Sequence, residues 1–275
     1  MSNGKTSFRI RSDVGIGGQY PLLIIAGPCV IESEELCTEI AHKMQESCRK
    51  FGLGYVFKAS FDKANRTSLE SFRGPGREEG LRILHDIRER FDVPVLTDVH
   101  EPSQPSDVAR IADIIQVPAF LCRQTDLLLA AGESDAVVNV KKGQFCAPEL
   151  MKSAADKVTS TGNQRIMLTE RGTFFGYNNL VVDMRNLVIM REQGVPVVFD
   201  ATHAVQLPGG RKDASGGQRE FVPPLCRASA AVGIDALFLE AHPRPEKALS
   251  DASTSLPLEQ INPILEQVQV LHGTV

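Results

Sequence analysis

The chain has 275 residues, of which 42% are hydrophobic and 23% charged, and its formal net charge is -4. These values are ordinary for a globular protein with a sizeable core, and they exclude a disordered chain. The acidic balance gives no overall preference for nucleic acid or anionic membranes, so an anion site has to be built locally. Because no run approaches the roughly 20 apolar residues of a membrane helix and the N-terminus lacks a signal-peptide core, we expect a cytoplasmic protein.

The first predicted element is a glycine-containing β-hairpin at residues 7–20. Short apolar, β-rich runs follow, with helical segments between them, at residues 22–27, 54–59, 93–99, 113–119, 136–141, 165–170, 195–200 and 235–241. Their near-continuous hydrophobicity is typical of parallel strands covered on both faces. After the first run, Leu36, Ile40, Met44, Cys48 and Phe51 recur at three- and four-residue steps, which predicts a helix over residues 33–52.

Eight such units without a break in composition predict a (β/α)8 TIM barrel. We expect one domain over residues 1–275, with the N-terminal hairpin closing the bottom of the barrel. A doubly wound sheet is the competing architecture, and the lack of a GxGxxG motif makes it the weaker one.

Polar or reactive residues follow each apolar run at its C-terminal edge. They are Cys29, Lys58, Asp98 with His100, Gln116, Lys141 with Lys142, Glu170 with Arg171, Asp200 with His203, and Glu240 with His242. In a barrel these edges meet on one face, where such folds carry their chemistry. Strand ends also turn polar without any function, but this does not explain the repeated lysine and arginine in an acidic chain.

Lys58, Lys63, Arg66, Lys142 and Arg171 form a cationic set suited to phosphate and carboxylate groups. For any one of them alone, a solvated surface charge is the commoner explanation. The segment KANRTSLES, which contains two of these residues, also reads as the start of a helix, where backbone N–H groups receive phosphate.

A second set, Cys29, His203, Glu240 and Asp251, mixes sulfur, nitrogen and oxygen ligands that fit zinc, ferrous iron or manganese. The four form no compact motif. Singly, Cys29 also reads as a small buried hydrophobe, His203 as a core histidine and Asp251 as a helix cap. Only convergence at one mouth favours a metal site.

The six cysteines include no CxxC pair and do not indicate a disulfide framework. Cys37 and Cys48 fall on the apolar face of the first predicted helix, and Cys226 lies in a helical stretch, so we expect these three to pack in the core. Cys122 and Cys146 lie nearer the mouth, and neither has an evident partner in the sequence.

The stretch QLPGGRKDASGGQRE, residues 206–220, holds four glycines between Gly209 and Gly217. Such a loop closes over substrate in some enzymes and excludes water. A flexible surface loop explains the same composition, and the sequence does not separate the two.

Long ordered blocks identify a family resemblance. AGPCVIES, FKASFDKANRTS, TDVHE, IQVPAFLCRQTDLL, NVKKGQF, TERGTFFGYNNLVVDMR, FDATHAVQLPGG and EAHPRPEKALSDAST together resemble the 3-deoxy-D-manno-octulosonate 8-phosphate synthase family, from about residue 7 to the C-terminus. The resemblance implies a bacterial (β/α)8 enzyme, usually a homotetramer, without an organic cofactor. Its implied reaction condenses phosphoenolpyruvate with arabinose 5-phosphate and water and releases inorganic phosphate, for lipopolysaccharide synthesis.

The same resemblance implies a metal-dependent and a metal-independent branch, with cysteine or asparagine, respectively, at the position of Cys29. The cysteine places this chain in the metal-dependent branch, with one divalent ion held by Cys29, His203, Glu240 and Asp251.

By resemblance, the substrate-binding residues form two groups. Phosphoenolpyruvate is expected at Lys58, Ser60, Lys63, Gln116, Pro118, Ala119, Phe120, Lys142 and Arg171, and arabinose 5-phosphate at Asn65, Arg66, Thr67 and Ser215. We predict Lys63, Asp98 and His203 as catalytic residues, with Lys63 or Asp98 moving protons.

Three other functions stay open at this point. A 3-deoxy-D-arabino-heptulosonate 7-phosphate synthase uses erythrose 4-phosphate, but the KANRTS block resembles the arabinose 5-phosphate enzymes rather than the KPRT pattern of that rival. A class I aldolase would use a Schiff-base lysine, which borohydride trapping reveals. A sugar-phosphate-binding barrel without catalysis would show binding and no turnover.

Overall fold

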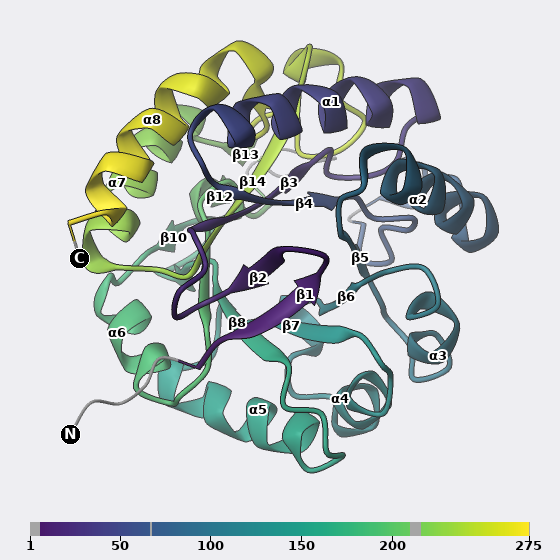
Figure 1. Ribbon diagram of the computed structural model, residues 1–275, viewed down its shortest axis with the longest axis vertical. Helices are drawn as coiled ribbons and strands as arrows, with labels where there is room; N and C mark the ends of the chain where they lie inside the picture. Colours follow the sequence, from purple (N-terminus) through teal and green to yellow (C-terminus); the bar gives the residue numbers. More distant parts are fainter. Residues whose placement is uncertain (1–5, 67, 210–215, 275) are drawn as a thin grey trace.

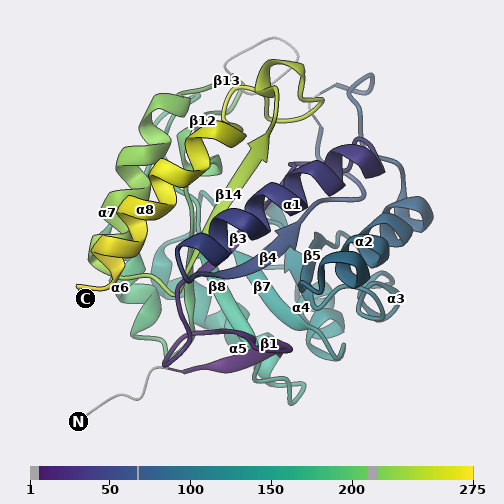
Figure 2. The ribbon, with the colours of Figure 1, turned by 45° about the horizontal axis from the view of Figure 1, so that its top comes forward.

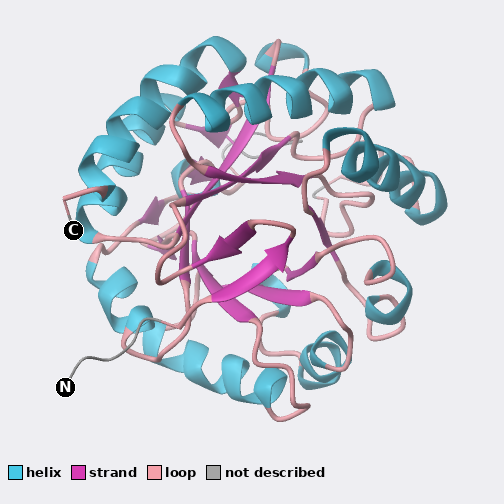
Figure 3. Ribbon diagram, viewed as in Figure 1, coloured by secondary structure: helices cyan, strands magenta, loops and turns pink. Residues whose placement is uncertain are grey.

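A ring of parallel strands surrounded by helices forms the fold in this computed structural model, which describes residues 6–66, 68–209 and 216–274 (Figures 1 and 3). The barrel strands are β3 (Leu23–Gly27), β4 (Gly54–Lys58), β5 (Val95–Asp98), β6 (Ile114–Val117), β7 (Val137–Lys141), β8 (Ile166–Glu170), β11 (Val197–Asp200) and β14 (Ala236–His242). Strand β11 pairs in parallel with both β8 and β14, which closes the ring. The predicted (β/α)8 barrel is confirmed.

Helices of one to four turns cover the outside of the ring (Figure 3). They are α1 (Glu34–Lys50), α2 (Arg77–Phe91), α3 (Pro105–Val108), α4 (Thr125–Gly132), α5 (Met151–Thr159), α6 (Arg185–Arg191), α7 (Val222–Val232) and α8 (Ile261–His272). Helix α1 matches its prediction closely. Ser33 caps it by accepting a hydrogen bond from the Leu36 N–H, and Glu34 and Glu35 favour its positive N-terminal end.

The barrel strands alternate between two cores because successive side chains of a strand point to opposite faces. In β7, for example, Val138 and Val140 pack outward with the helices, whereas Val137 packs inside the ring. The interior cluster comprises Ile16, Leu23, Ile25, Val56, Leu96, Ile114, Val137, Met167, Val198, Ala236 and Phe238. This parity decides which strand-end residues reach the mouth.

The N-terminal hairpin consists of β1 (Phe8–Arg11) and β2 (Val14–Ile16) and lies across the centre of the ring in Figure 1 and at its lower end in Figure 2. Ile16 is fully buried in the interior cluster, and Phe8, Ile10 and Val14 pack against it. The hairpin therefore closes the N-terminal end of the barrel, as the sequence predicts.

Smaller elements decorate the connections. They are the two-stranded sheets of β9 (Thr173–Phe174) with β10 (Leu180–Val181) and of β12 (Gln206–Leu207) with β13 (Gly216–Gly217), and the short strand β15 (Leu256–Pro257) beside β14. The helix start expected in the KANRTSLES segment is wrong for its described part, since turns and bends occupy it and α2 begins only at Arg77. In the described part of the chain, every helix is too short or too polar to cross a membrane.

All six cysteines are buried. Cys37, Cys48 and Cys226 belong to the core between strands and helices, which confirms their expected packing role. Cys122 and Cys146 do have a partner that the sequence did not reveal, because each is the neighbour of the other, with 3.9 Å between their sulfur atoms. Their contact joins the connection after β6 to the connection after β7.

Candidate active site

A cavity of about 410 Å³ lies at the C-terminal end of the barrel strands. Most of the side chains predicted from the sequence line it: Lys58, Lys63, Asn65, Arg66, Asp98, Gln116, Pro118, Ala119, Phe120, Arg171, His203 and Asp251. A second groove, of about 780 Å³, lies among α1, α2 and the start of α8. Because that groove holds none of the predicted residues, the mouth of the barrel is the candidate site.

A chain of hydrogen bonds crosses the barrel interior below the cavity. The Thr169 hydroxyl donates to Asn139 Oδ1 at 2.7 Å, Asn139 Nδ2 donates to Gln116 Oε1 at 2.9 Å, and Gln116 Nε2 donates to Asp98 Oδ1. Ser60 donates to the other oxygen of Asp98. Asp98, Gln116, Asn139 and Thr169 occupy inward-facing positions of their strands, and Ser60 follows β4 by two residues, so the fold itself orders this layer.

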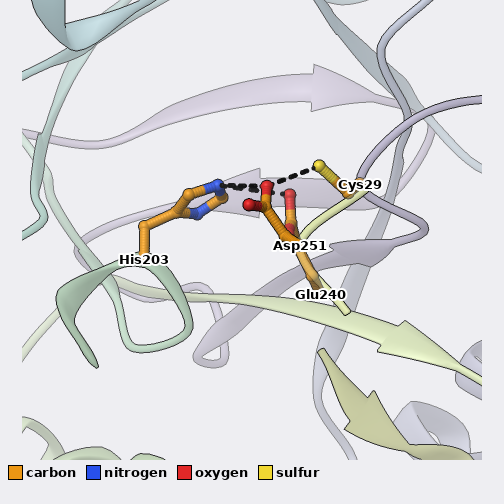
Figure 4. Close-up of side chains that lie close together, drawn as sticks. All are labelled: Cys29, His203, Glu240 and Asp251. Atoms are coloured by element: carbon orange, nitrogen blue, oxygen red, sulfur yellow. Dashed lines mark hydrogen bonds and ion pairs between the residues drawn. The ribbon is translucent and has the colours of Figure 1, made fainter. Parts of the chain in front are cut away.

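Cys29, His203, Glu240 and Asp251 converge on one point, with one ligand atom from each lying within 4.8 Å of the others (Figure 4). The Cys29 thiol donates to Asp251 Oδ2 at 2.8 Å, and His203 Nε2 lies 3.6 Å from the same oxygen and 3.4 Å from Glu240 Oε1. Residues 29, 203, 240 and 251 are far apart in sequence, and the barrel brings them together as predicted.

The backbone around these four residues is held firmly. Cys29 follows β3, where an isolated bridge joins Val30 to Ser60. Asp251 adopts a left-handed conformation, with φ of 47°, and its carbonyl accepts the backbone N–H groups of Thr254 and Ser255, both at 3.0 Å. Aspartate tolerates this conformation better than most residues, so the loop presents its carboxylate in one direction.

The electrostatics of the cluster suit a cation. Burial, and then the nearby Asp251 and Glu240 carboxylates, raise the pKa of the Cys29 thiol well above its usual value. Glu240 Oε2 is buried without a hydrogen-bond partner in the described part of the chain. A divalent ion would draw the proton from the thiol and give that oxygen a partner, and the sulfur, nitrogen and oxygen donors suit zinc, iron or manganese.

His203 is oriented from behind by a carboxylate. Its Nδ1 lies 2.7 Å from Asp200 Oδ2, and the backbone N–H of His203 donates to Asp200 Oδ1 at 3.0 Å. A proton on Nδ1 leaves the lone pair of Nε2 facing the cluster. Carboxylates occupy this supporting position behind many metal-binding histidines.

Cationic side chains outnumber carboxylates around the cavity. Of the described lining residues, Lys58, Lys63, Arg66, Lys141 and Arg171 are cationic, whereas Asp98 and Asp251 are the carboxylates. Anionic ligands are therefore favoured even though the whole chain is acidic.

Lys63 and Asp98 influence each other across 3.8 Å. Burial opposes the charge on Lys63, but the surrounding Cys29, Asp98 and Glu240 outweigh it and hold the pKa of the ammonium above its usual range. Burial likewise opposes ionisation of Asp98, yet Lys58 and Lys63 hold the pKa of this carboxyl below its usual value. Both groups therefore stay charged at neutral pH.

Arg171 offers an unused donor at the same site. Its Nη2 donates to Gln206 Oε1 at 2.6 Å, whereas its Nη1 is buried with no hydrogen-bond partner among the residues described. Burial lowers the pKa of the guanidinium, although the carboxylates around it oppose that shift. A buried donor of this kind needs an acceptor, and the cavity beside it can supply an anionic one.

Lys142 does not line the cavity, whereas its neighbour Lys141 does. Lys142 is fully buried, with Nζ donating to Gly143 O, Cys146 O and Thr173 Oγ1, and it lies 3.6 Å from Glu170 Oε2. The reason is strand parity: counting from the inward Val137, position 141 faces inward and position 142 outward. The alternation along the strand is visible in the sequence and favours Lys141 over Lys142 as the inward-facing lysine.

Other predicted residues lie beside the cavity or outside the described structure. Ser60, Cys29 and Glu240 are buried and do not line the cavity, although Cys29 and Glu240 lie close to its lining residues His203 and Asp251. Thr67 and Ser215 lie outside the described residues, as does most of the glycine-rich stretch between Gly209 and Gly217.

The structure also reveals lining residues that had no predicted role. Those with long polar side chains are His100, Lys141, Gln144 and Gln206. His100 and Lys141 stand among the strand-end residues noted in the sequence, so position alone could have found them. The two glutamines carry no sequence signal, because their importance depends on contacts between separate loops.

The barrel, the cationic cavity and a cluster of four side chains that could hold a metal ion together define a class: (β/α)8 proteins with an anion-binding cavity at the C-terminal end of their strands. Residues 5–273 match the DAHP synthetase I family, and the chain belongs to it. It is similar to proteins named 2-dehydro-3-deoxyphosphooctonate aldolase, which confirms the resemblance of its sequence blocks.

Three of these relatives align over nearly their whole length. The protein of Syntrophotalea carbinolica is 58% identical over 264 residues, covering 96% of this chain and 95% of the relative. That of Methylococcus capsulatus is 54% identical over 277 residues, covering 100% and 98%. That of Xanthomonas campestris pv. campestris is 56% identical over 259 residues, covering 94% of each.

Proposed function

We propose that this protein condenses phosphoenolpyruvate with arabinose 5-phosphate and water, giving 3-deoxy-D-manno-octulosonate 8-phosphate and inorganic phosphate. The observation that carries the proposal is that the candidate metal site and the cationic cavity share two residues. His203 and Asp251 belong both to the metal cluster and to the lining of the cationic cavity. A ligand rich in negative charge would therefore lie directly beside the bound ion. The names of the similar proteins support the same reaction.

Phosphoenolpyruvate fits the deeper part of the cavity, next to Lys63, Lys141 and Arg171. The unused Nη1 of Arg171 and the ammonium groups of the two lysines suit its phosphate and carboxylate oxygens. In this proposal Lys141, which lines the cavity, takes the role that the family resemblance implies for Lys142. Gln116 and the segment of Pro118, Ala119 and Phe120 shape the rest of the pocket.

Arabinose 5-phosphate fits the outer part, where Asn65 is exposed and Arg66 is partly exposed. Arg66 donates through Nε to Phe72 O at 3.1 Å and lies against Leu249 O through Nη2 at 3.4 Å. The second contact is long, so this nitrogen is available to a phosphate oxygen at little cost. Two anionic substrates side by side explain the number of cationic side chains.

The reaction joins C3 of phosphoenolpyruvate to the aldehyde carbon of the sugar. Because an enol ether is a weak nucleophile, the main contribution of the protein is to hold the two reacting carbons at contact distance. As that bond forms, C2 gains positive character and takes up water. The resulting hemiketal phosphate then loses inorganic phosphate, which balances the equation.

Lys63 is the proton donor in this proposal, because it is charged and lines the cavity. Asp98 is a poor base, since its oxygens accept hydrogen bonds from Ser60 and Gln116 and its pKa lies below the usual range. We therefore assign Asp98 to orienting Lys63. Cys29, His203, Glu240 and Asp251 would hold one divalent ion, which supplies a Lewis acid or template for the aldehyde or the water.

A homotetramer, as the family resemblance implies, gives exposed apolar side chains a cover. They lie in the connection after β7 and in the β9–β10 hairpin with its turn: Phe145, Leu150, Phe174, Phe175, Tyr177 and Val181. Tyr177 is 98% exposed and Phe175 72% exposed. Side chains of this size and number are typical of a subunit interface.

The test is release of inorganic phosphate from phosphoenolpyruvate on addition of arabinose 5-phosphate, in one preparation before and after a chelator. We expect release that stops on chelation and returns with divalent metal. Equal release from the chelated, metal-free protein would reject the metal role. Release with erythrose 4-phosphate instead would assign the related seven-carbon synthase reaction, and binding of both substrates without turnover would make the protein a binding barrel.

A further inference from the structure

Gln206 connects the anion-binding side of the cavity with the metal cluster. Its Oε1 accepts a hydrogen bond from Arg171 Nη2 at 2.6 Å, and its Nε2 donates one to Asp251 Oδ1 at 2.9 Å. Arg171 follows β8 and Asp251 lies in the loop after β14, so one side chain joins two connections of the barrel.

On the metal side, Gln206 gives the two carboxylate oxygens of Asp251 different hydrogen-bond partners. Oδ1 accepts from Gln206, whereas Oδ2 accepts from the Cys29 thiol at 2.8 Å and lies 3.6 Å from His203 Nε2. The hydrogen bond from Gln206 therefore turns Oδ2 toward the other ligands. Supporting hydrogen bonds of this kind set the orientation of metal-binding carboxylates.

On the anion side, Gln206 fixes the plane of the Arg171 guanidinium. The side-chain oxygen of Gln206 accepts the hydrogen bond from Arg171 Nη2. Arg171 Nη1 stays buried and has no hydrogen-bond partner among the described residues. Because a guanidinium is rigid and planar, holding one nitrogen sets the direction of the other.

The amide of Gln206 has only one favourable orientation. A rotation by 180° would place its NH₂ against the cationic Arg171 and its oxygen against the Asp251 carboxylate. The backbone is fixed as well, since Gln206 begins β12 directly after the short helix His203–Val205 and pairs with Gly217. Gln206 thus follows the metal ligand His203 by three residues.

We propose that Gln206 is a positioning residue that sets Arg171 for the anionic substrate and Asp251 for the metal ion at the same time. The inference rests on the proposed function, because it takes phosphoenolpyruvate as the anion and a divalent ion as the metal.

The test compares wild type with Gln206→Met, which keeps the length of the side chain and removes both hydrogen bonds. The exposed Gln269→Met on α8 is the matched control. Two dissociation constants are measured without turnover: that of Zn²⁺, by competition with a chromogenic chelator, and that of phosphoenolpyruvate on metal-free protein, by calorimetry. Thermal unfolding of the metal-free proteins checks the fold.

We expect Gln206→Met to weaken Zn²⁺ binding by about 10- to 100-fold, the usual effect of losing a supporting hydrogen bond. Binding of phosphoenolpyruvate should weaken by about 10-fold, as for a lost hydrogen bond to a charged group. Gln206→Leu is the second variant: it is shorter than methionine, adds no charge and also removes both hydrogen bonds, so both constants should weaken as in Gln206→Met. The control should match wild type.

An unchanged constant for either ligand in Gln206→Met overturns the inference. Should Gln206→Met fail to fold, unchanged Zn²⁺ or phosphoenolpyruvate binding in Gln206→Leu overturns it equally. Failure of the proposed function looks different, because wild type itself would then bind neither Zn²⁺ nor phosphoenolpyruvate. Wild-type binding of both, with no change in the variants, rejects only the role of Gln206.

Discussion

His203 Nδ1 and Asp200 Oδ2 lie 2.7 Å apart, and this contact directs the other ring nitrogen of His203 toward Glu240 and Asp251. Asp200 is completely buried at the end of β11 and also receives Lys141 Nζ. Burial opposes its ionisation, but His203 and Lys141 hold the pKa of its carboxyl below the usual range. The aspartate is therefore a fixed charge that sets the imidazole.

We predict that Asp200→Asn lowers metal affinity by about 10- to 100-fold, because the amide no longer holds the imidazole in one tautomer. Competition with a chelator measures the affinity. The exposed Asp126→Asn on α4 is the control and should bind metal like wild type. Equal affinities in all three proteins would show that Asp200 does not orient His203.

The two adjacent lysines should behave differently. Lys141→Met is expected to weaken phosphoenolpyruvate binding by about 10-fold or more, because a charged donor leaves the cavity. Lys142→Met is expected to lower the free energy of unfolding by about 3–5 kcal/mol, because it leaves the fully buried Glu170 without its cation. Calorimetry measures the first effect and denaturant unfolding the second.

The double variant Lys142→Met with Glu170→Gln serves as the control for the second effect. It should recover much of the lost stability, since no unpaired ion stays buried. Loss of phosphoenolpyruvate binding in Lys142→Met, with normal binding in Lys141→Met, would reverse the assignment of the two lysines.

Asp98 should make stability depend on pH in a defined direction. Its pKa in the folded protein lies below the ordinary value of 3.8, so the folded state stabilises the ionised form. The contribution of Asp98 is therefore complete above about pH 5 and is lost as the pH falls below about 4. We predict that the difference in unfolding free energy between wild type and Asp98→Asn is largest at neutral pH and narrows in acid.

Urea unfolding at a series of pH values measures this difference, with Asp126→Asn as the control. A difference that stays constant down to pH 3 would mean that Asp98 is not stabilised by its charge.

The exposed aromatic side chains allow a test of assembly. Phe175→Glu should shift the protein from a tetramer to smaller species, because a buried unpaired carboxylate at an interface is costly. Light scattering coupled to size exclusion gives the mass. Val270→Glu, at a 61% exposed position on α8, is the matched control and should leave the mass unchanged. A tetramer in both variants would place the interface elsewhere.

The sequence predicts the barrel well because its signals are local. Each apolar run is a strand within about two residues, and the capping Ser33 marks the start of α1. The convergence of Cys29, His203, Glu240 and Asp251 is also predictable, since the C-terminal ends of barrel strands and the connections that follow them share one face.

The remaining features depend on contacts that no local pattern encodes. Gln206 matters only because Arg171 and Asp251 approach it from separate connections. The contact of Cys122 with Cys146 likewise needs two loops to meet. The two adjacent lysines are a different case. The alternation of side chains along β7 shows that Lys141 faces inward, once the interior face of the strand is known.

The N-terminal hairpin limits how substrates and products reach and leave the cavity. Ile16 and the interior cluster fill the barrel from below, so the described residues leave no passage from one end to the other. In the part of the chain that the structure describes, the cavity is therefore reached from the C-terminal side of the barrel. Inorganic phosphate and the newly made sugar acid would then leave on the same side of the barrel as the substrates enter. Slow departure of either product would hold back the next turnover.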